Sequence, residues 1–119
     1  MKVLIAEDEA ILRRLLRSYL ERWGHEVVVA ENGADAWNLF QAGAFPIVIS
    51  DWVMPEMDGP TLLRELRSRD PGMKIIFVSG YAEDAFQKHL PTDGRRPEFL
   101  AKPFTLKQLV AAVKETLAA

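Results

Sequence analysis

The chain has 119 residues, of which 49% are hydrophobic and 27% charged, so its composition is that of one globular domain and excludes a disordered chain. Its 15 basic and 17 acidic residues are spread along the sequence, so neither a nucleic acid nor a membrane surface is expected as a direct partner. Cysteine is absent and no apolar run is long enough to span a bilayer, which excludes disulfides and thiolate metal sites and favours the cytoplasm.

The first third of the chain predicts two strand–helix pairs. A short apolar run over Val3–Ala6 indicates a strand, and the apolar residues from Ile11 to Trp23 recur at three- and four-residue spacing, which predicts a helix with one apolar face. Gly24 is expected to end this helix. A second strand is expected over Glu26–Ala30 and a second helix from about Ala34 to Ala42.

The middle of the chain continues the alternation. The run Ile47–Ser50 indicates a third strand, and a third helix is expected from Pro60 to about Asp70. A fourth strand follows over Lys74–Val78. The segment Ala82–Leu90 predicts only a weak helix, and the residues after it indicate an exposed loop.

The last strand is predicted over Phe99–Ala101, and Thr105 with Gln108 forms a capping-box pattern that begins the last helix. Strands that alternate with helices in this way form a parallel sheet with helices on both faces. We therefore expect residues 1–119 to form a single α/β domain. Its predicted architecture is a flavodoxin-like, doubly wound (β/α)5 three-layer sandwich with a five-stranded parallel sheet. The strand order 2-1-3-4-5 is taken from known folds of this kind, because the alternation alone does not determine it.

Polar and reactive side chains stand at the carboxyl ends of four predicted strands. They are Glu7 and Asp8, Asp51, Ser79 and Lys102. Alone, each would be interpreted as a helix cap, a turn former or a solvated charge. In an open parallel sheet, however, the ligand site lies outside the carboxyl ends of the strands. Neighbouring strands lie about 4.8 Å apart, so Asp8 and Asp51 can share a cation, and only a long side chain such as Lys102 reaches Asp51 from two strands away.

Several converging carboxylates repel one another unless a cation lies between them. Oxygen ligands without His or Cys favour Mg²⁺, and the backbone carbonyl of Val53 can add a further ligand. Once a metal and Lys102 neutralise the negative charge, an ionised Asp51 can attack a phosphoryl group in line and form an acyl phosphate. The residues thus predict Asp51 as the nucleophile and Lys102 as its electrostatic clamp.

Four segments resemble the response-regulator receiver domains of two-component signalling, and together they extend along the whole chain. They are Val3–Glu9, Ile49–Gly59, Val78–Gly80 and Lys102–Phe104. The resemblance implies that Asp51 receives a phosphoryl group from a histidine kinase or a histidine phosphotransfer protein, and that an unknown downstream protein reads the change. Such a chain is a signalling phosphoacceptor that assists its own phosphorylation and slow dephosphorylation, and not an enzyme in its own right.

The resemblance also implies a set of metal ligands. Glu7, Asp8, Asp51 and the Val53 carbonyl would hold Mg²⁺, for which Mn²⁺ can substitute. Glu7 stands where the family usually has Asp, which leaves open whether it reaches the metal directly or through water.

Further roles follow from the same resemblance for the residues at the last two strands. Ser79 and Lys102 would contact the phosphoryl group, and the bond between Lys102 and Pro103 is expected to be cis. Phe99 stands where the family often has Tyr, and it would follow Ser79 inward. This movement would reshape the face formed by the fourth helix, fifth strand and fifth helix, and thereby change partner binding.

Val53 and Tyr81 occupy the two positions that influence phosphoryl hydrolysis in this family. Because an apolar and a bulky side chain orient an attacking water poorly, we predict a long-lived phosphoryl state that Val53→Asn shortens. Trp52, beside Asp51, is expected to be exposed.

Two other functions remain open from the sequence. A Mg²⁺-dependent phosphohydrolase would also use an Asp at a strand end, but it generally needs a second acid at the position of Val53. A non-phosphorylated interaction scaffold with the same fold would not need Asp8, Asp51 and Lys102 together. The second half of the chain resembles receivers of hybrid histidine kinases and the first half stand-alone regulators, so a stand-alone, excised or composite domain is possible. A monomer or weak dimer is expected.

Overall fold

The computed structural model describes residues 2–52, 57–79 and 98–118. These residues form the following elements in chain order: β1 (Lys2–Ala6), α1 (Ala10–Arg22), β2 (Glu26–Ala30), α2 (Gly33–Ala42), β3 (Ile47–Asp51), α3 (Gly59–Arg69), β4 (Lys74–Ser79), β5 (Glu98–Ala101) and α5 (Leu106–Ala118). The weak helix predicted over Ala82–Leu90 lies outside the described residues. None of the helices in the described ranges has the length and hydropathy needed to cross a membrane.

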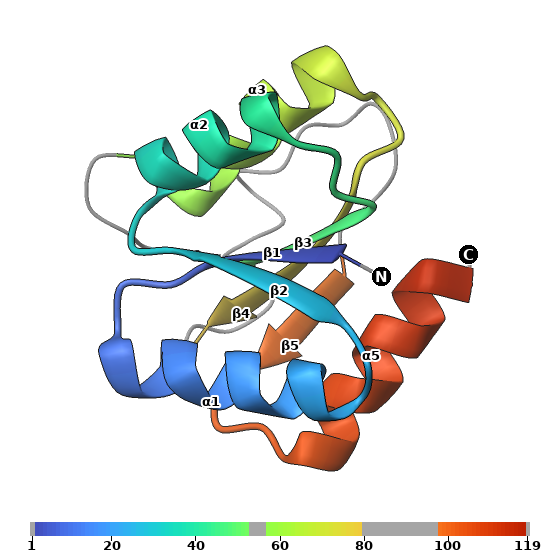
Figure 1. The fold of residues 1–119 in the computed structure, drawn as a ribbon. Coiled ribbons are helices and arrows are strands. Elements are labelled where there is room, and N and C mark those ends of the chain that lie inside the picture. Colours follow the sequence, from blue (N-terminus) through green and yellow to red (C-terminus); the bar gives the residue numbers. More distant parts are fainter. Residues whose placement is uncertain (1, 53–56, 80–97, 119) are drawn as a thin grey trace.

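The five strands form one parallel sheet in the order β2-β1-β3-β4-β5, which confirms the predicted doubly wound topology. Helices α2 and α3 cover one face of the sheet and α1 and α5 cover the other, so the domain has three layers (Figure 1). Each strand begins and ends within one residue of its predicted bounds. The agreement is close because the strands contain short apolar runs; β1, β3 and β4 are buried nearly throughout, whereas the edge strands β2 and β5 are partly exposed.

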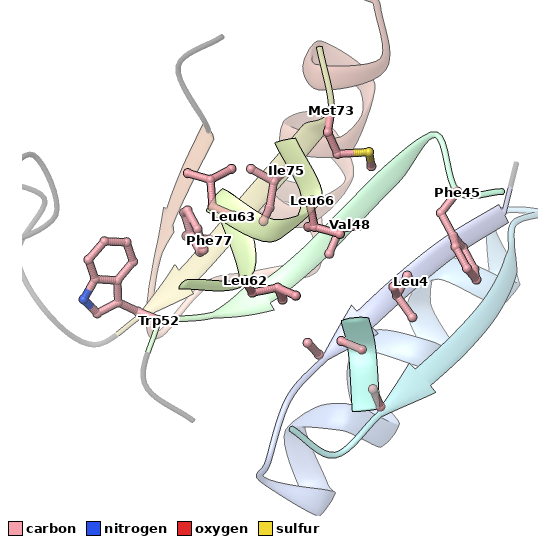
Figure 2. Packing of buried hydrophobic residues seen from close by; sticks show 13 residues of the cluster. Leu4, Phe45, Val48, Trp52, Leu62, Leu63, Leu66, Met73, Ile75 and Phe77 are labelled. Carbon is pink, nitrogen blue, oxygen red and sulfur yellow. The ribbon is translucent and has the colours of Figure 1, made fainter. Parts of the chain in front are cut away.

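The sheet separates two hydrophobic cores, because successive side chains of a strand point to opposite faces. On β1, Leu4 and Ala6 join the core beneath α2 and α3, whereas Val3 and Ile5 join the core beneath α1 and α5. Figure 2 shows the first of these cores, in which Phe77 of β4 is one of the largest buried side chains. The same alternation decides which residues at the strand ends face each helical layer.

Helix α1 buries a narrower stripe than the sequence predicts. Leu16 and Leu20 are buried against the sheet, but Ile11 is 77% exposed, Leu15 43% and Trp23 51%. The apolar positions of this helix cover a wider arc than the sheet can contact, so the outer ones remain at the surface. The apolar face predicted for this helix is therefore only partly buried.

The helix ends follow their sequence signals. The Asn32 and Asp58 side chains cap α2 and α3 by accepting backbone N–H groups at 2.8 Å and 2.9 Å. Thr105 and Gln108 form the predicted capping box, in which each side chain accepts the backbone N–H of the other residue, at 2.8 Å and 3.1 Å. Gly24 follows α1 with a φ of 89°, a conformation that glycine adopts at low cost.

Candidate functional site

Asp51 ends β3 at the carboxyl edge of the sheet, and its carboxylate is held from two sides. The residue is 8% exposed. Its Oδ1 accepts the backbone N–H of Trp52 at 2.7 Å, and its Oδ2 lies 3.3 Å from the Nζ of Lys102. The carboxylate therefore has a fixed orientation and a neighbouring cation.

Trp52 is buried, with 8% of its surface exposed, so the prediction that it is exposed is wrong. Its indole meets the ring of Phe77 edge to face, with ring centroids 5.1 Å apart (Figure 2). Val48 of β3 belongs to the same core, and the two-residue period of the strand continues from Val48 to Trp52. Trp52 is therefore buried because it continues the alternation of β3, although it lies next to Asp51 at the site.

Glu7 and Asp8 follow β1 and bring two more carboxylates to this edge. The Glu7 side chain is fully buried; its Oε2 accepts the backbone N–H of Glu9 at 3.1 Å, and its Oε1 lies 3.4 Å from the Nζ of Lys102. Asp8 is exposed. Carboxylate oxygens of Glu7, Asp8 and Asp51 all lie within 4.8 Å of one another, which is the convergence that the sequence predicts.

The electrostatics of the site follow from burial and from these neighbours. Burial raises the pKa of Glu7 to about 7, and the charge of Asp51 acts in the same direction, while the Glu9 amide and Lys102 oppose the shift. Burial also disfavours the charged form of Lys102. Asp51 and Glu7 outweigh that effect, so the pKa of Lys102 lies above its ordinary value.

Ser79 and Lys102 complete the carboxyl edge from β4 and β5. The backbone N–H of Lys102 donates to the Ser79 carbonyl at 2.7 Å, and the bond between Lys102 and Pro103 is cis, as predicted. Ser79 is 1% exposed and follows Val78, which is the register partner of Asp51. Ser79 therefore stands one position beyond the partner of Asp51 on the adjacent strand.

The donor set fits a hard divalent cation. Three carboxylates converge in the described part of the chain, and the positive charge of Lys102 offsets only one of them. Oxygen ligands without His or Cys suit Mg²⁺. A bound cation would also offset the energetic cost of burying an ionised Glu7. Glu7, Asp8 and Asp51 are therefore the residues that can hold Mg²⁺.

Other predicted site residues are not brought into the cluster or cannot be placed. Phe99 is half-buried on β5 and packs against the core beneath α2 and α3. Val53 and Tyr81, predicted to add a metal ligand and to tune hydrolysis, lie outside the described residues.

The sequence reasoning missed Arg13, which contacts the site, and Gly33, which packs tightly elsewhere. Arg13 of α1 donates from Nη1 to the carbonyl of Glu7 at 2.9 Å, although an arginine on an amphipathic helix is usually interpreted as a solvated charge. Its position one turn into the helix that follows the acidic pair is the signal that points to it. Gly33 lies so close to the Met57 carbonyl that a Cβ there would overlap with it, a contact that no local pattern reveals.

Comparison with known proteins places this chain in a family. Residues 3–114 match the response regulator receiver domain. The chain is 52% identical over 117 residues to the sensor kinase CckA of Brucella abortus (strain 2308), a match that covers 97% of this chain and 12% of that protein.

Further relatives match over nearly their whole length. The chain is 38% identical over 120 residues to the response regulator receiver protein CpdR of Brucella abortus (strain 2308), covering 99% of this chain and 98% of that protein. A response regulator receiver protein from Sinorhizobium medicae WSM419, known from its crystal structure, is 34% identical with a TM-score of 0.90, covering 100% of this chain and 95% of that one. With its strand order and its cluster of acidic residues, the chain belongs to the response regulator receiver domains, the phosphoacceptor domains of two-component signalling.

Proposed function

We propose that Asp51 accepts a phosphoryl group from a histidine kinase or a histidine phosphotransfer protein, and that a downstream protein reads the phosphorylated state. One observation carries the proposal: the fixed Asp51 carboxylate lies 3.3 Å from the Lys102 Nζ and within 4.8 Å of two other carboxylates. A carboxylate so placed is a nucleophile with charge compensation beside it. The protein is then a phosphoacceptor and not an enzyme that turns over a separate substrate.

The transfer forms one bond and breaks one bond. An oxygen of Asp51 attacks the phosphorus, and the bond from phosphorus to the donor breaks, so that the donor leaves with the electron pair. Oδ1 accepts the shorter bond, from the Trp52 amide, whereas Oδ2 lies on the side of Lys102, so Oδ2 is proposed as the attacking oxygen. Lys102 then faces the negative charge that develops on the phosphoryl oxygens.

The acidic residues prepare the site for a divalent cation. Mg²⁺, or Mn²⁺ in its place, would supply positive charge that offsets the carboxylates and the phosphoryl oxygens. Glu7, Asp8 and Asp51 would hold it with the carbonyl of Val53, which lies outside the described residues. Because Glu7 is buried, it would contribute most to cation binding when its carboxylate is ionised and paired with the cation.

The change in shape is proposed to begin at Ser79. Its hydroxyl would contact the phosphoryl group from the strand beside Asp51, and Phe99 would move inward with it. The backbone bond from Lys102 to the Ser79 carbonyl connects this movement to β5. The face read by the downstream protein would consist of β5, α5 and the preceding helix, whose predicted residues lie outside the described ranges.

A protein donor needs a surface close to Asp51, and an apolar groove of about 720 Å³ lies next to it. Ile11 and Leu15 of α1 line the groove with Phe104, and Lys102 borders both the groove and the site. Because Lys102 is common to both, a donor bound in the groove would have its phosphohistidine near Asp51. The exposure of Ile11 and Leu15 is then explained by the binding of the donor.

Several finer expectations stay predictions under this proposal. They are the single-domain organisation, the cytoplasmic location, the lack of direct nucleic-acid binding and the monomeric or weakly dimeric state. The slow hydrolysis inferred from Val53 and Tyr81 is a further one, and a faster decay of the phosphorylated protein in Val53→Asn would support it.

The proposal is tested by intact mass spectrometry after incubation with Mg²⁺ and acetyl phosphate. We expect a Mg²⁺-dependent gain of one phosphoryl group in the wild type and none in Asp51→Asn. Asp58→Asn is the matched control: it removes one exposed carboxylate while Asn retains the capping ability, so it is expected to be phosphorylated normally. A folded wild type that gains no phosphoryl group would favour the interaction scaffold, and catalytic release of phosphate without a stable adduct would favour a phosphohydrolase.

A further inference from the structure

Arg13 is the residue of α1 that reaches back to the acidic loop after β1. Its Nη1 donates to the Glu7 carbonyl at 2.9 Å and lies 3.5 Å from the Asp8 carbonyl. Its Nη2 lies 3.6 Å from a carboxylate oxygen of Glu31, in the segment that follows β2. The side chain is only 17% exposed although it carries a charge. It therefore lies between the two loops at the carboxyl ends of β1 and β2.

These contacts fix the backbone that carries two of the three clustered carboxylates. The guanidinium is planar and has several donors in a rigid fork, so one side chain can hold two neighbouring carbonyls in a fixed direction. The Glu7 amide adds a bond to the Ala30 carbonyl at 3.1 Å, which anchors the start of the loop to β2. Without the guanidinium, the loop at Asp8 would lose the side-chain contacts that connect it to α1 and to Glu31.

Such an anchor matters because the clustered carboxylates repel one another. Carboxylate oxygens of Glu7, Asp8 and Asp51 lie within 4.8 Å, and like charges at that distance repel. Asp8 is exposed, so a shift of its backbone would move its carboxylate away from the cluster. The described contacts of Arg13 to this loop are to backbone carbonyls and not to the clustered carboxylates, so it acts through loop geometry more than through direct charge pairing.

We propose that Arg13 is a positioning residue of the phosphoacceptor site, which holds the Glu7 and Asp8 carbonyls so that both carboxylates face Asp51. The inference rests on the proposed function and deepens it. Removal of a group that contacts the metal ligands, and not the metal itself, typically lowers metal affinity by about 10- to 100-fold. The exposed ion pair with Glu31 is expected to contribute little, since Glu31 is 75% exposed.

The test measures Mg²⁺ binding by isothermal titration calorimetry and stability by urea unfolding in EDTA. Arg13→Lys keeps the charge but loses the fork, and we expect its Mg²⁺ dissociation constant to rise about tenfold. Arg14→Gln is the matched control: it removes a positive charge from the adjacent exposed position of α1 and is expected to change Mg²⁺ affinity less than twofold. Glu31→Gln is expected to behave like this control.

The outcomes separate this inference from the proposed function. Wild type that binds Mg²⁺, with Arg13→Lys indistinguishable from it, overturns the positioning role and leaves the proposed function intact. If the wild type does not bind Mg²⁺, both the positioning role and the proposed function are overturned. Backbone amide spectra distinguish positioning from general destabilisation: perturbed signals are expected in residues 7–10 and 30–31, and changes throughout the sheet overturn the proposal. Should Arg13→Lys not fold, Arg13→Gln, which keeps an amide donor, is judged by the same criteria.

Discussion

The buried carboxyl of Glu7 predicts how the stability of the metal-free protein depends on pH. Burial raises the pKa of Glu7 from 4.5 to about 7 on folding. Below pH 4.5 Glu7 is protonated in both the folded and the unfolded state, so it causes no pH dependence. Between pH 4.5 and 7 the unfolded chain is ionised while the folded protein keeps its proton, so the free energy of unfolding falls as the pH rises. Above pH 7 the loss is complete.

The size of the effect follows from the two pKa values. Their difference corresponds to a loss of roughly 3 kcal/mol in the free energy of unfolding between pH 4.5 and pH 8. Glu7→Gln replaces the carboxyl by a neutral group of the same shape and removes this dependence. We therefore expect Glu7→Gln to be close to the wild type in stability at pH 4.5 and more stable by up to roughly 3 kcal/mol at pH 8.

The assay is urea unfolding followed by circular dichroism in EDTA, at constant ionic strength and at several pH values from 4.5 to 8. The difference between Glu7→Gln and the wild type cancels the titration of the groups that do not interact with Glu7. A difference that changes by less than about 1 kcal/mol over this range, or that changes in the opposite direction, would refute the reasoning. Saturating Mg²⁺ should reverse the trend for the wild type alone, because the metal binds ionised Glu7 and competes with its proton.

Three further changes have defined outcomes. Gly33→Ala should lower the free energy of unfolding by about 1–3 kcal/mol in a urea titration, because the new Cβ would overlap with the Met57 carbonyl, whereas Gly72→Ala, with nothing closer than 3.7 Å, should be nearly neutral; equal effects would contradict this packing. Lys102→Met should bind Mg²⁺ several-fold more tightly in calorimetry, because a competing cation 3.3 Å from Asp51 is removed. The same variant should no longer be phosphorylated by acetyl phosphate. Weaker Mg²⁺ binding would argue against the charge balance described for the site. Thr116→Val should raise the urea midpoint by the equivalent of about 1 kcal/mol, because the buried hydroxyl has no hydrogen-bond partner within the described residues, and a lower midpoint would imply a partner for it.

The sheet and the acidic cluster were predictable because their signals are local. Each strand is an apolar run, and the reactive residue follows directly at its carboxyl end, as with Asp51 after β3 and Lys102 after β5. Parallel pairing then brings those ends to one edge without further information. The capping box at Thr105 is local in the same sense, since both partners lie within one helical turn.

Features that depend on the tertiary arrangement were not predictable in this way. The apolar residues of α1 gave no indication that Ile11 and Leu15 would stay exposed, because the width of the buried stripe depends on where α1 crosses the sheet. Trp52 was misassigned because its burial follows from the continued alternation of β3 and from the ring of Phe77 on another strand. Arg13 was missed because its partners are backbone carbonyls, which every sequence contains.

The contact between Lys102 and Glu7 joins residues 95 positions apart, and the contact between Lys102 and Asp51 joins residues 51 positions apart. During synthesis the three acidic side chains therefore leave the ribosome well before the lysine that balances them. These contacts form only when β1, β3, β4 and β5 are paired in one sheet, so a chain that has not assembled this sheet lacks the site. Under the proposed function, only molecules with an assembled sheet would then accept a phosphoryl group.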